Sequence, residues 1–115
     1  MPTRDLRLLE HMIRLNALHF GMEPHLRDTR QFAEIARVAT EIERLGNDTV
    51  FMNWPKEPGF PHAPERYERF RQDLIQGAKD VRAAAEAGNT AQISQAYARM
   101  DASCTACHKR YSPTY

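Results

Sequence analysis

Cys104 and Cys107 stand three residues apart and are followed at once by His108, close to the end of the 115-residue chain. This Cys-x-x-Cys-His spacing is the signature of covalent c-type haem attachment. On a helix, positions i, i+3 and i+4 share one face, so both sulfurs and the imidazole can meet one flat cofactor. The motif predicts one haem c, held by thioether bonds to both cysteines, with His108 as the proximal iron ligand.

Two other uses of the cysteine pair fit the sequence less well. A redox disulfide of this spacing normally opens a helix after a strand, whereas this pair comes near the end of a helical pattern. A structural zinc site needs four protein ligands, and the chain has no second cysteine pair. One of four scattered histidines would have to complete such a site: His11, His19, His25 or His62.

Length and charge set limits on the function. With 115 residues, the chain is predicted to form a single domain, residues 1–115, around one core. Its formal net charge of +1 gives no field that favours nucleic acid, and no apolar run is long enough to span a membrane. No paired carboxylates, no nucleophile with a base and no second metal cluster accompany the haem motif, so we do not expect an enzyme.

The first residues lack the apolar stretch of a signal peptide. Covalent haem attachment in c-type cytochromes takes place outside the cytoplasmic membrane. We therefore expect the natural precursor to carry an export signal that is removed from the given chain, and the predicted location is the periplasm.

Apolar residues at helical spacing predict four helices, at about residues 3–22, 28–46, 64–88 and 89–112. Asp28 and Asn89 each precede a glutamine by three residues, as in a capping box, and Pro64 suits a first helical position. Gly46 is expected to close the second helix in the left-handed conformation, and Gly88 to stop the third. Helices of this length, joined by short turns apart from one longer link, predict an all-α antiparallel four-helix bundle.

Three features of these elements bear on the site. The first helix carries two apolar stripes, which is more apolar surface than one neighbouring helix can bury. The additional surface could face the cofactor or a second copy of the chain. In the link, prolines rule out regular helix over most of residues 49–63, and the aromatic residues Phe51, Trp54 and Phe60 are expected to plug the end of the core. The basic residues of the third helix are expected to form a solvated face, and Gly77 to mark a close approach by a neighbour.

The chain resembles the cytochrome c′ family, the class II branch of c-type cytochromes. The resemblance rests on His19-Phe20-Gly21, on the alanine-rich stretch from Val81 to Gly88, and on the run from Ala102 to His108 followed by Tyr111. It implies an up-and-down bundle with haem near the C-terminal helix and, in many members, a homodimer through helices one and two. The family often has a basic residue directly after that tyrosine, where this chain has Ser112.

The residue that faces iron opposite His108 decides between electron transfer and gas binding. The resemblance implies that this distal position comes from the first helix. Aligning on His19-Phe20-Gly21 places Ile13 there, whereas aligning on Met22 places Met12 there. Helical geometry puts Met12 near the middle of the apolar arc, so its thioether is either an iron ligand or a gap-filling core group.

Two functions from different classes follow. The first is a monohaem electron carrier that docks a redox partner protein, with Lys109 and Arg110 steering an acidic partner. The second is a five-coordinate haem protein that binds nitric oxide or carbon monoxide in an apolar distal pocket around Ile13. Asn16 could donate to the gas or bond a neighbouring helix. His19 resembles a family position that is not a ligand, so we expect it to be structural; His11, His25 and His62 are expected to be exposed or in loops.

Overall fold

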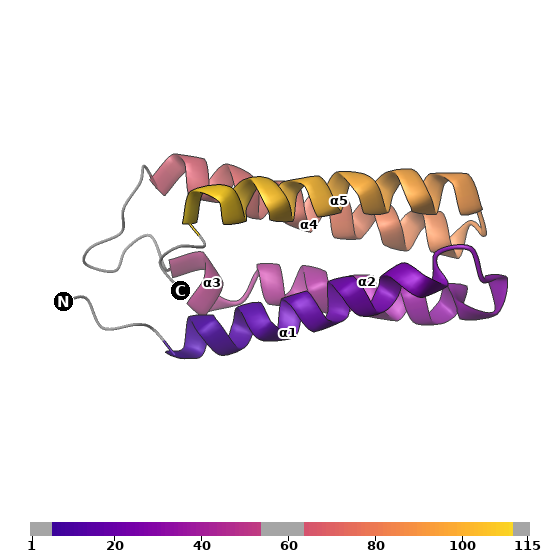
Figure 1. Cartoon of the computed structure of the whole chain (residues 1–115), viewed down its shortest axis with the longest axis horizontal. Helices are drawn as coiled ribbons and strands as arrows, with labels where there is room; N and C mark the ends of the chain where they lie inside the picture. Colours follow the sequence, from indigo (N-terminus) through magenta and orange to yellow (C-terminus); the bar gives the residue numbers. More distant parts are fainter. Residues whose placement is uncertain (1–5, 54–63, 112–115) are drawn as a thin grey trace.

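The computed structural model describes residues 6–53 and 64–111, with all side chains there except those of residues 6, 8, 9, 64 and 108–111. Its long helices are α1 (Leu6–Met22), α2 (Phe32–Gly46), α4 (Pro64–Glu86) and α5 (Thr90–Tyr111). Successive long helices run in opposite directions, with α1 and α2 in one layer and α4 and α5 in the other (Figure 1). The packing of α2 on α4 joins the layers. The predicted all-α antiparallel four-helix bundle is confirmed.

The apolar stripes predicted for the second, third and fourth helices form most of the core. Their buried members are Phe32, Ile35, Ala39, Ile42, Leu45, Tyr67, Leu74, Ala78, Val81, Ala85, Ile93, Tyr97 and Met100. Burial of these side chains is the main force that holds the helices together, since an isolated helix is only marginally stable in water. No helix in the two described segments combines the length and the apolar character needed to cross a membrane.

The helix starts use side-chain caps. The Oδ1 atom of Asn89 accepts a hydrogen bond from the backbone N–H of Gln92 at 3.0 Å, at the start of α5. The Oδ1 atom of Asp28 accepts from the backbone N–H of Arg30, also at 3.0 Å. The turn that Asp28 caps is a 3₁₀ turn (Thr29–Gln31), so α2 begins at Phe32, later than the sequence predicts. Each cap satisfies an N–H group that has no partner within its own helix.

Two of the glycines serve close packing between helices. Gly88 has φ 67° and stops α4 as predicted, but Gly46 remains helical, so the prediction that it takes the left-handed conformation is wrong. What Gly46 provides is space, because a Cβ atom there would lie 2.8 Å from Cγ1 of Ile75 on α4. At Gly77, a Cβ atom would lie 2.9 Å from the Cβ of Met100 on α5, which confirms the predicted close approach.

The long connection begins with a short helix, α3 (Thr49–Asn53), which the sequence pattern does not predict. The Oδ1 atom of Asp48 starts it by accepting a hydrogen bond from the backbone N–H of Val50 at 2.9 Å. Phe51 is buried at the end of the core, as predicted. Trp54 and Phe60, for which the same role is predicted, lie outside the described residues.

The two apolar stripes of α1 have different environments. Met12, Leu15, His19 and Met22 are buried, whereas Ile13 and Phe20 are 60% and 57% exposed. The backbone of α1 packs chiefly on α2 and α3, and less closely on α5. One stripe therefore contributes to the core, and the other leaves an apolar strip on the surface of the bundle.

Candidate functional site

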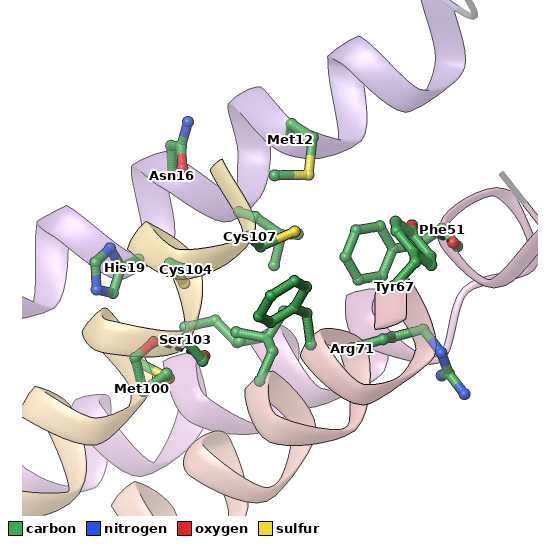
Figure 2. Close-up of a pocket in the computed structure, with 14 residues that line it drawn as sticks. Met12, Asn16, His19, Phe51, Tyr67, Arg71, Met100, Ser103, Cys104 and Cys107 are labelled. Atoms are coloured by element: carbon green, nitrogen blue, oxygen red, sulfur yellow. Dashed lines mark hydrogen bonds between the residues drawn. The ribbon is translucent and has the colours of Figure 1, made fainter. Parts of the chain in front are cut away.

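A pocket lies among α1, α4 and α5, close to the end of the bundle that α3 closes (Figure 2). It is lined by Met12, Leu15, Asn16, His19, Ile42, Phe51, Tyr67, Phe70, Arg71, Leu74, Met100, Ser103, Cys104 and Cys107. Its cavity volume is about 30 Å³, far smaller than the roughly 300–1,000 Å³ of a typical ligand pocket. The pocket is therefore mostly filled by its own side chains, and a larger group enters only if these side chains move apart.

Both cysteines of the motif line this pocket from α5 and are half-buried, with free thiols. Burial raises the pKa of Cys104 to about 11, and the nearby carboxylate of Asp101 adds to the increase. Burial likewise raises the pKa of Cys107 to about 12, with a further contribution from Cys104. At neutral pH both groups are thiols rather than thiolates, so they are poorly prepared to bind a metal ion directly.

The backbone of His108 continues α5 directly after Cys107, in helical register with Cys104. Its side chain lies outside the described residues, as do those of Lys109 and Arg110. Ser112 lies outside them altogether. The roles predicted for His108, Lys109 and Arg110 therefore stay predictions.

Among the candidates on α1, Met12 and Asn16 line the pocket and Ile13 does not. Figure 2 shows the Met12 side chain descending from α1 toward Cys107. Ile13 is 60% exposed because its position is turned by about 100° from that of Met12, away from the core. The structure thus brings together Met12, Asn16 and the two cysteines, and it leaves Ile13 at the surface.

An aromatic group closes the pocket at the α3 end. The Tyr67 hydroxyl donates a hydrogen bond to the backbone carbonyl of Phe51 at 2.5 Å, and the Phe51 ring stacks on the imidazole of His11 with centroids 5.7 Å apart. The Nε2 atom of His11 lies 2.6 Å from the backbone oxygen of Leu45. His11 is half-buried, so the prediction that it is exposed is wrong. The prediction that His25 is exposed is confirmed. His62 lies outside the described residues.

Arg71 is the pocket residue that the sequence analysis misplaces. It is 5% exposed rather than part of a solvated face. Its Nη1 atom donates to the backbone oxygen of Gly46 at 2.9 Å, and its guanidinium also pairs with Glu68. A cation is favourable there, because the last carbonyl groups of α2 form the negative end of the helix dipole. The available signal was its spacing, since Tyr67, Arg71 and Leu74 share one helical face.

His19 is buried at the other side of the pocket, where α1 faces α5. Its Nε2 atom lies 3.1 Å from Oδ1 of Asp101, close enough for an ion pair when the imidazole is protonated. Its ring stacks on that of Tyr97, with centroids 5.0 Å apart and an angle of 12° between the planes. The Tyr97 hydroxyl donates to the backbone oxygen of His19 at 3.1 Å.

The chemistry of this pocket fits a covalently attached haem. Apolar side chains dominate the lining, as a porphyrin requires, and two thiols from one turn of α5 reach the same space. No three histidine, cysteine or carboxylate side chains form a metal-binding group within the described residues. A ring much larger than the present cavity requires the lining to open. The backbones of α1 and α5 pack less closely than those of α4 and α5, so this seam is one place where the lining can open.

Comparison with known proteins agrees with the motif. The family model described as cytochrome C′ matches residues 28–112, which is most of the chain. The match begins after α1, so the helix that carries Met12 and Ile13 lies outside it. No curated protein and no solved structure matches the chain.

Proposed function

The chain belongs to the cytochrome c′ family, and from this premise we propose that it carries electrons as a monohaem c-type cytochrome. The observation that carries the proposal is the meeting of Cys104, Cys107 and Met12 in one apolar pocket. When bound, haem supplies an iron that alternates between the ferric and ferrous states and so exchanges one electron. The cysteines would hold it through thioether bonds, and His108 would bind its iron on the proximal side.

Met12 would supply a second protein ligand to the iron. It reaches the pocket from α1, across from the cysteine-bearing face of α5 (Figure 2). A thioether at this position raises the reduction potential, which suits a carrier rather than a site open to small molecules. The surrounding apolar side chains exclude water and favour a neutral thioether over a charged or strongly hydrated ligand.

The test is the visible spectrum of protein matured in a host that assembles c-type cytochromes. We expect an intact mass that includes one haem, a low-spin spectrum and the methionine-to-iron charge-transfer band. Met12→Leu should abolish this band and lower the reduction potential, because leucine fills a similar volume without a sulfur atom. Met22→Leu is the matched control, since Met22 is also buried on α1 but does not line the pocket. A bare polypeptide mass, or an unchanged band in Met12→Leu, would contradict the proposal.

The second candidate function is the binding of nitric oxide or carbon monoxide. The observation that favours it is the apolar lining supplied by Leu15, Phe70 and Leu74, with the polar residue Asn16 also in the lining. Ile13, expected at the centre of such a site, lies outside it. A high-spin spectrum without the charge-transfer band, together with tight gas binding that weakens in Asn16→Leu, would support this function over electron transfer.

The exposed strip of α1 supports a homodimer formed through α1 and α2. Ile13, Ala17 and Phe20 share one face of α1 and are all exposed. Large apolar side chains gathered in this way favour a protein partner. Sedimentation should show a dimer that Phe20→Asp converts to a monomer, whereas Met52→Asp, at an exposed methionine of α3, leaves it intact. A monomeric parent protein would rule the dimer out.

The remaining parts of the proposal follow from the haem. One domain comprising residues 1–115 would act in the periplasm, where haem c is attached, and would exchange electrons with a redox partner protein rather than catalyse a reaction of its own. Detection of the haem-loaded protein in the periplasmic fraction of its native cells tests this location.

A further inference from the structure

We propose that His19, Asp101 and Tyr97 form a latch that sets the position of α1 against α5 and thereby holds Met12 at the level of the cysteine motif. This inference deepens the proposed function and depends on it, because it assigns positioning residues to the proposed Met12 ligand. None of the three residues is assigned to bind the haem.

The latch lies where α1 has few other constraints. The backbone of α1 packs chiefly on α2 and α3, while α5 packs on α4. Within the described residues, two polar contacts between α1 and α5 meet at His19: its Nε2 atom faces Asp101 at 3.1 Å, and its backbone oxygen accepts from the Tyr97 hydroxyl at 3.1 Å. Both contacts involve the same turn of each helix. Together they therefore fix the position of α1 along the axis of α5 as well as the contact between the two helices.

The stacked rings make this contact directional. The His19 and Tyr97 planes lie at 12° with centroids 5.0 Å apart, and the ring of Phe20 packs on the His19 imidazole with centroids 4.7 Å apart. Burial raises the pKa of Tyr97 to about 12, with smaller contributions from the carboxylates of Glu23 and Asp101. The hydroxyl therefore keeps its proton and remains a hydrogen-bond donor under ordinary conditions.

Helical register connects the latch to Met12. Because α1 and α5 are antiparallel (Figure 1), a step toward the start of α1 corresponds to a step toward the end of α5. Met12 comes seven residues before His19, a rise of about 10.5 Å at 1.5 Å per residue. The same step along α5 leads from Tyr97 to Cys104 and from Asp101 to His108. Fixing His19 opposite Tyr97 and Asp101 therefore fixes Met12 opposite the haem-attachment motif.

A shift of one helical turn would remove this alignment. The rise per turn is about 5.4 Å, which is far longer than the tolerance of a metal–ligand bond. The apolar contacts of α1 are less demanding, since aliphatic side chains can repack after small displacements. The polar and stacked contacts at His19 are the ones that distinguish one register from another.

The experiment uses the haem-loaded full chain with Asp101→Asn and Tyr97→Phe, separately and together. Two quantities are followed on heating: the methionine-to-iron charge-transfer band and the helical circular dichroism. We expect the band in the variants to disappear at a lower temperature than in the parent, while the helical melting temperature changes less. Asp80→Asn is the matched control, because Asp80 also pairs with an arginine of α5, at 4.0 Å from Arg99, but lies away from the pocket lining.

Hydrogen exchange provides a readout that does not depend on the band. In Asp101→Asn, amides of α1 around His19 should lose protection by up to about fivefold, the change expected for the loss of one partly exposed ion pair. Amides of α2 should keep their protection. Equal loss in α1 and α2, or a band that disappears together with the helices, would overturn the latch.

The two proposals fail differently. If the parent protein lacks the charge-transfer band, Met12 is not a ligand, and both the proposed ligation and the latch are wrong. If the parent has the band and neither Asp101→Asn nor Tyr97→Phe shifts its loss relative to helix melting, only the latch is wrong.

Discussion

The seam between α4 and α5 and the seam between α1 and α5 are built differently. At the first, Gly77 lets the two backbones approach so closely that an added Cβ atom would lie 3.1 Å from the Cα of Met100. At the second, α1 keeps its distance and touches α5 through the side chains around His19. The tight seam gives the cysteines of α5 a rigid support, whereas the loose seam leaves room for a pocket beside them.

This contrast separates two tasks. A covalent attachment site needs a fixed backbone, because both sulfurs must reach one flat group. A distal side chain needs only to be brought to the correct height, and a few directional contacts suffice. The three predictions below test the tight seam, the cysteines that it supports and the aromatic closure of the pocket, in order of decreasing expected effect.

The strongest test adds one methyl group at the tight α4–α5 seam and, for comparison, one at an open position of α1. Gly77→Ala should destabilise the protein by about 1–3 kcal/mol, because overpacking forces α4 and α5 apart. Gly21→Ala, on α1, should instead stabilise it by up to about 1 kcal/mol, since an added Cβ meets nothing within 4 Å and alanine favours helix. Urea unfolding of both variants measures the difference. Equal effects of the two substitutions would mean that α4 and α5 are not closely packed at Gly77.

The second test uses the pH dependence of the haem-free protein. The folded state raises the pKa of Cys104 to about 11 and of Cys107 to about 12 from 9.0, so it holds these protons more tightly than the unfolded state. The contribution of the two thiols to the free energy of unfolding is fully present below pH 9 and is lost as the pH rises through 11 to 12. At pH 8, alkylation of the folded protein should be about tenfold slower than that of the unfolded chain. A higher pKa makes each thiolate more nucleophilic, but it lowers the fraction of thiolate by a larger factor. Cys104→Ser/Cys107→Ser should reduce the alkaline loss of stability.

The smallest effect concerns the aromatic closure of the pocket. Tyr67→Phe removes the hydroxyl that donates to the Phe51 carbonyl, and it should cost about 0.5–1.5 kcal/mol, the net value of one buried hydrogen bond. Amides of α3 should exchange faster in this variant, while those of α5 near Met100 should not change. An equal increase in both places would mean that α3 is not a separate closure.

Local sequence patterns predict the long helices well. Each has an apolar stripe at helical spacing. The end of α4 at Gly88 and the cap of α5 at Asn89 were also predictable, because each depends on the chemistry of a single residue. The errors occur where a distant partner decides the outcome. Gly46 leaves no room for a Cβ atom beside Ile75, a close approach that the local pattern does not predict, and Arg71 is buried because the end of α2 offers carbonyl oxygens to its guanidinium.

The same division applies to the candidate site. Spacing alone placed Cys104 and Cys107 on one face of a helix, and the structure adds that both thiols line one apolar pocket. Spacing could not choose between Met12 and Ile13, because both lie on the broad apolar arc of α1. The packing of α1 against its neighbours buries Met12 at the pocket and leaves Ile13 exposed.

The amino-acid sequence by itself determined the four long helices and the attachment motif at the end of the last one, because helical periodicity and the Cys-x-x-Cys-His spacing are properties of neighbouring residues. Only the tertiary structure decided which stripe of α1 enters the core and which residues meet across the pocket. It also revealed that His19 contacts Asp101 and Tyr97. These outcomes depend on contacts between residues far apart in the chain, and the burial of one helix face is chosen by what the other helices present to it.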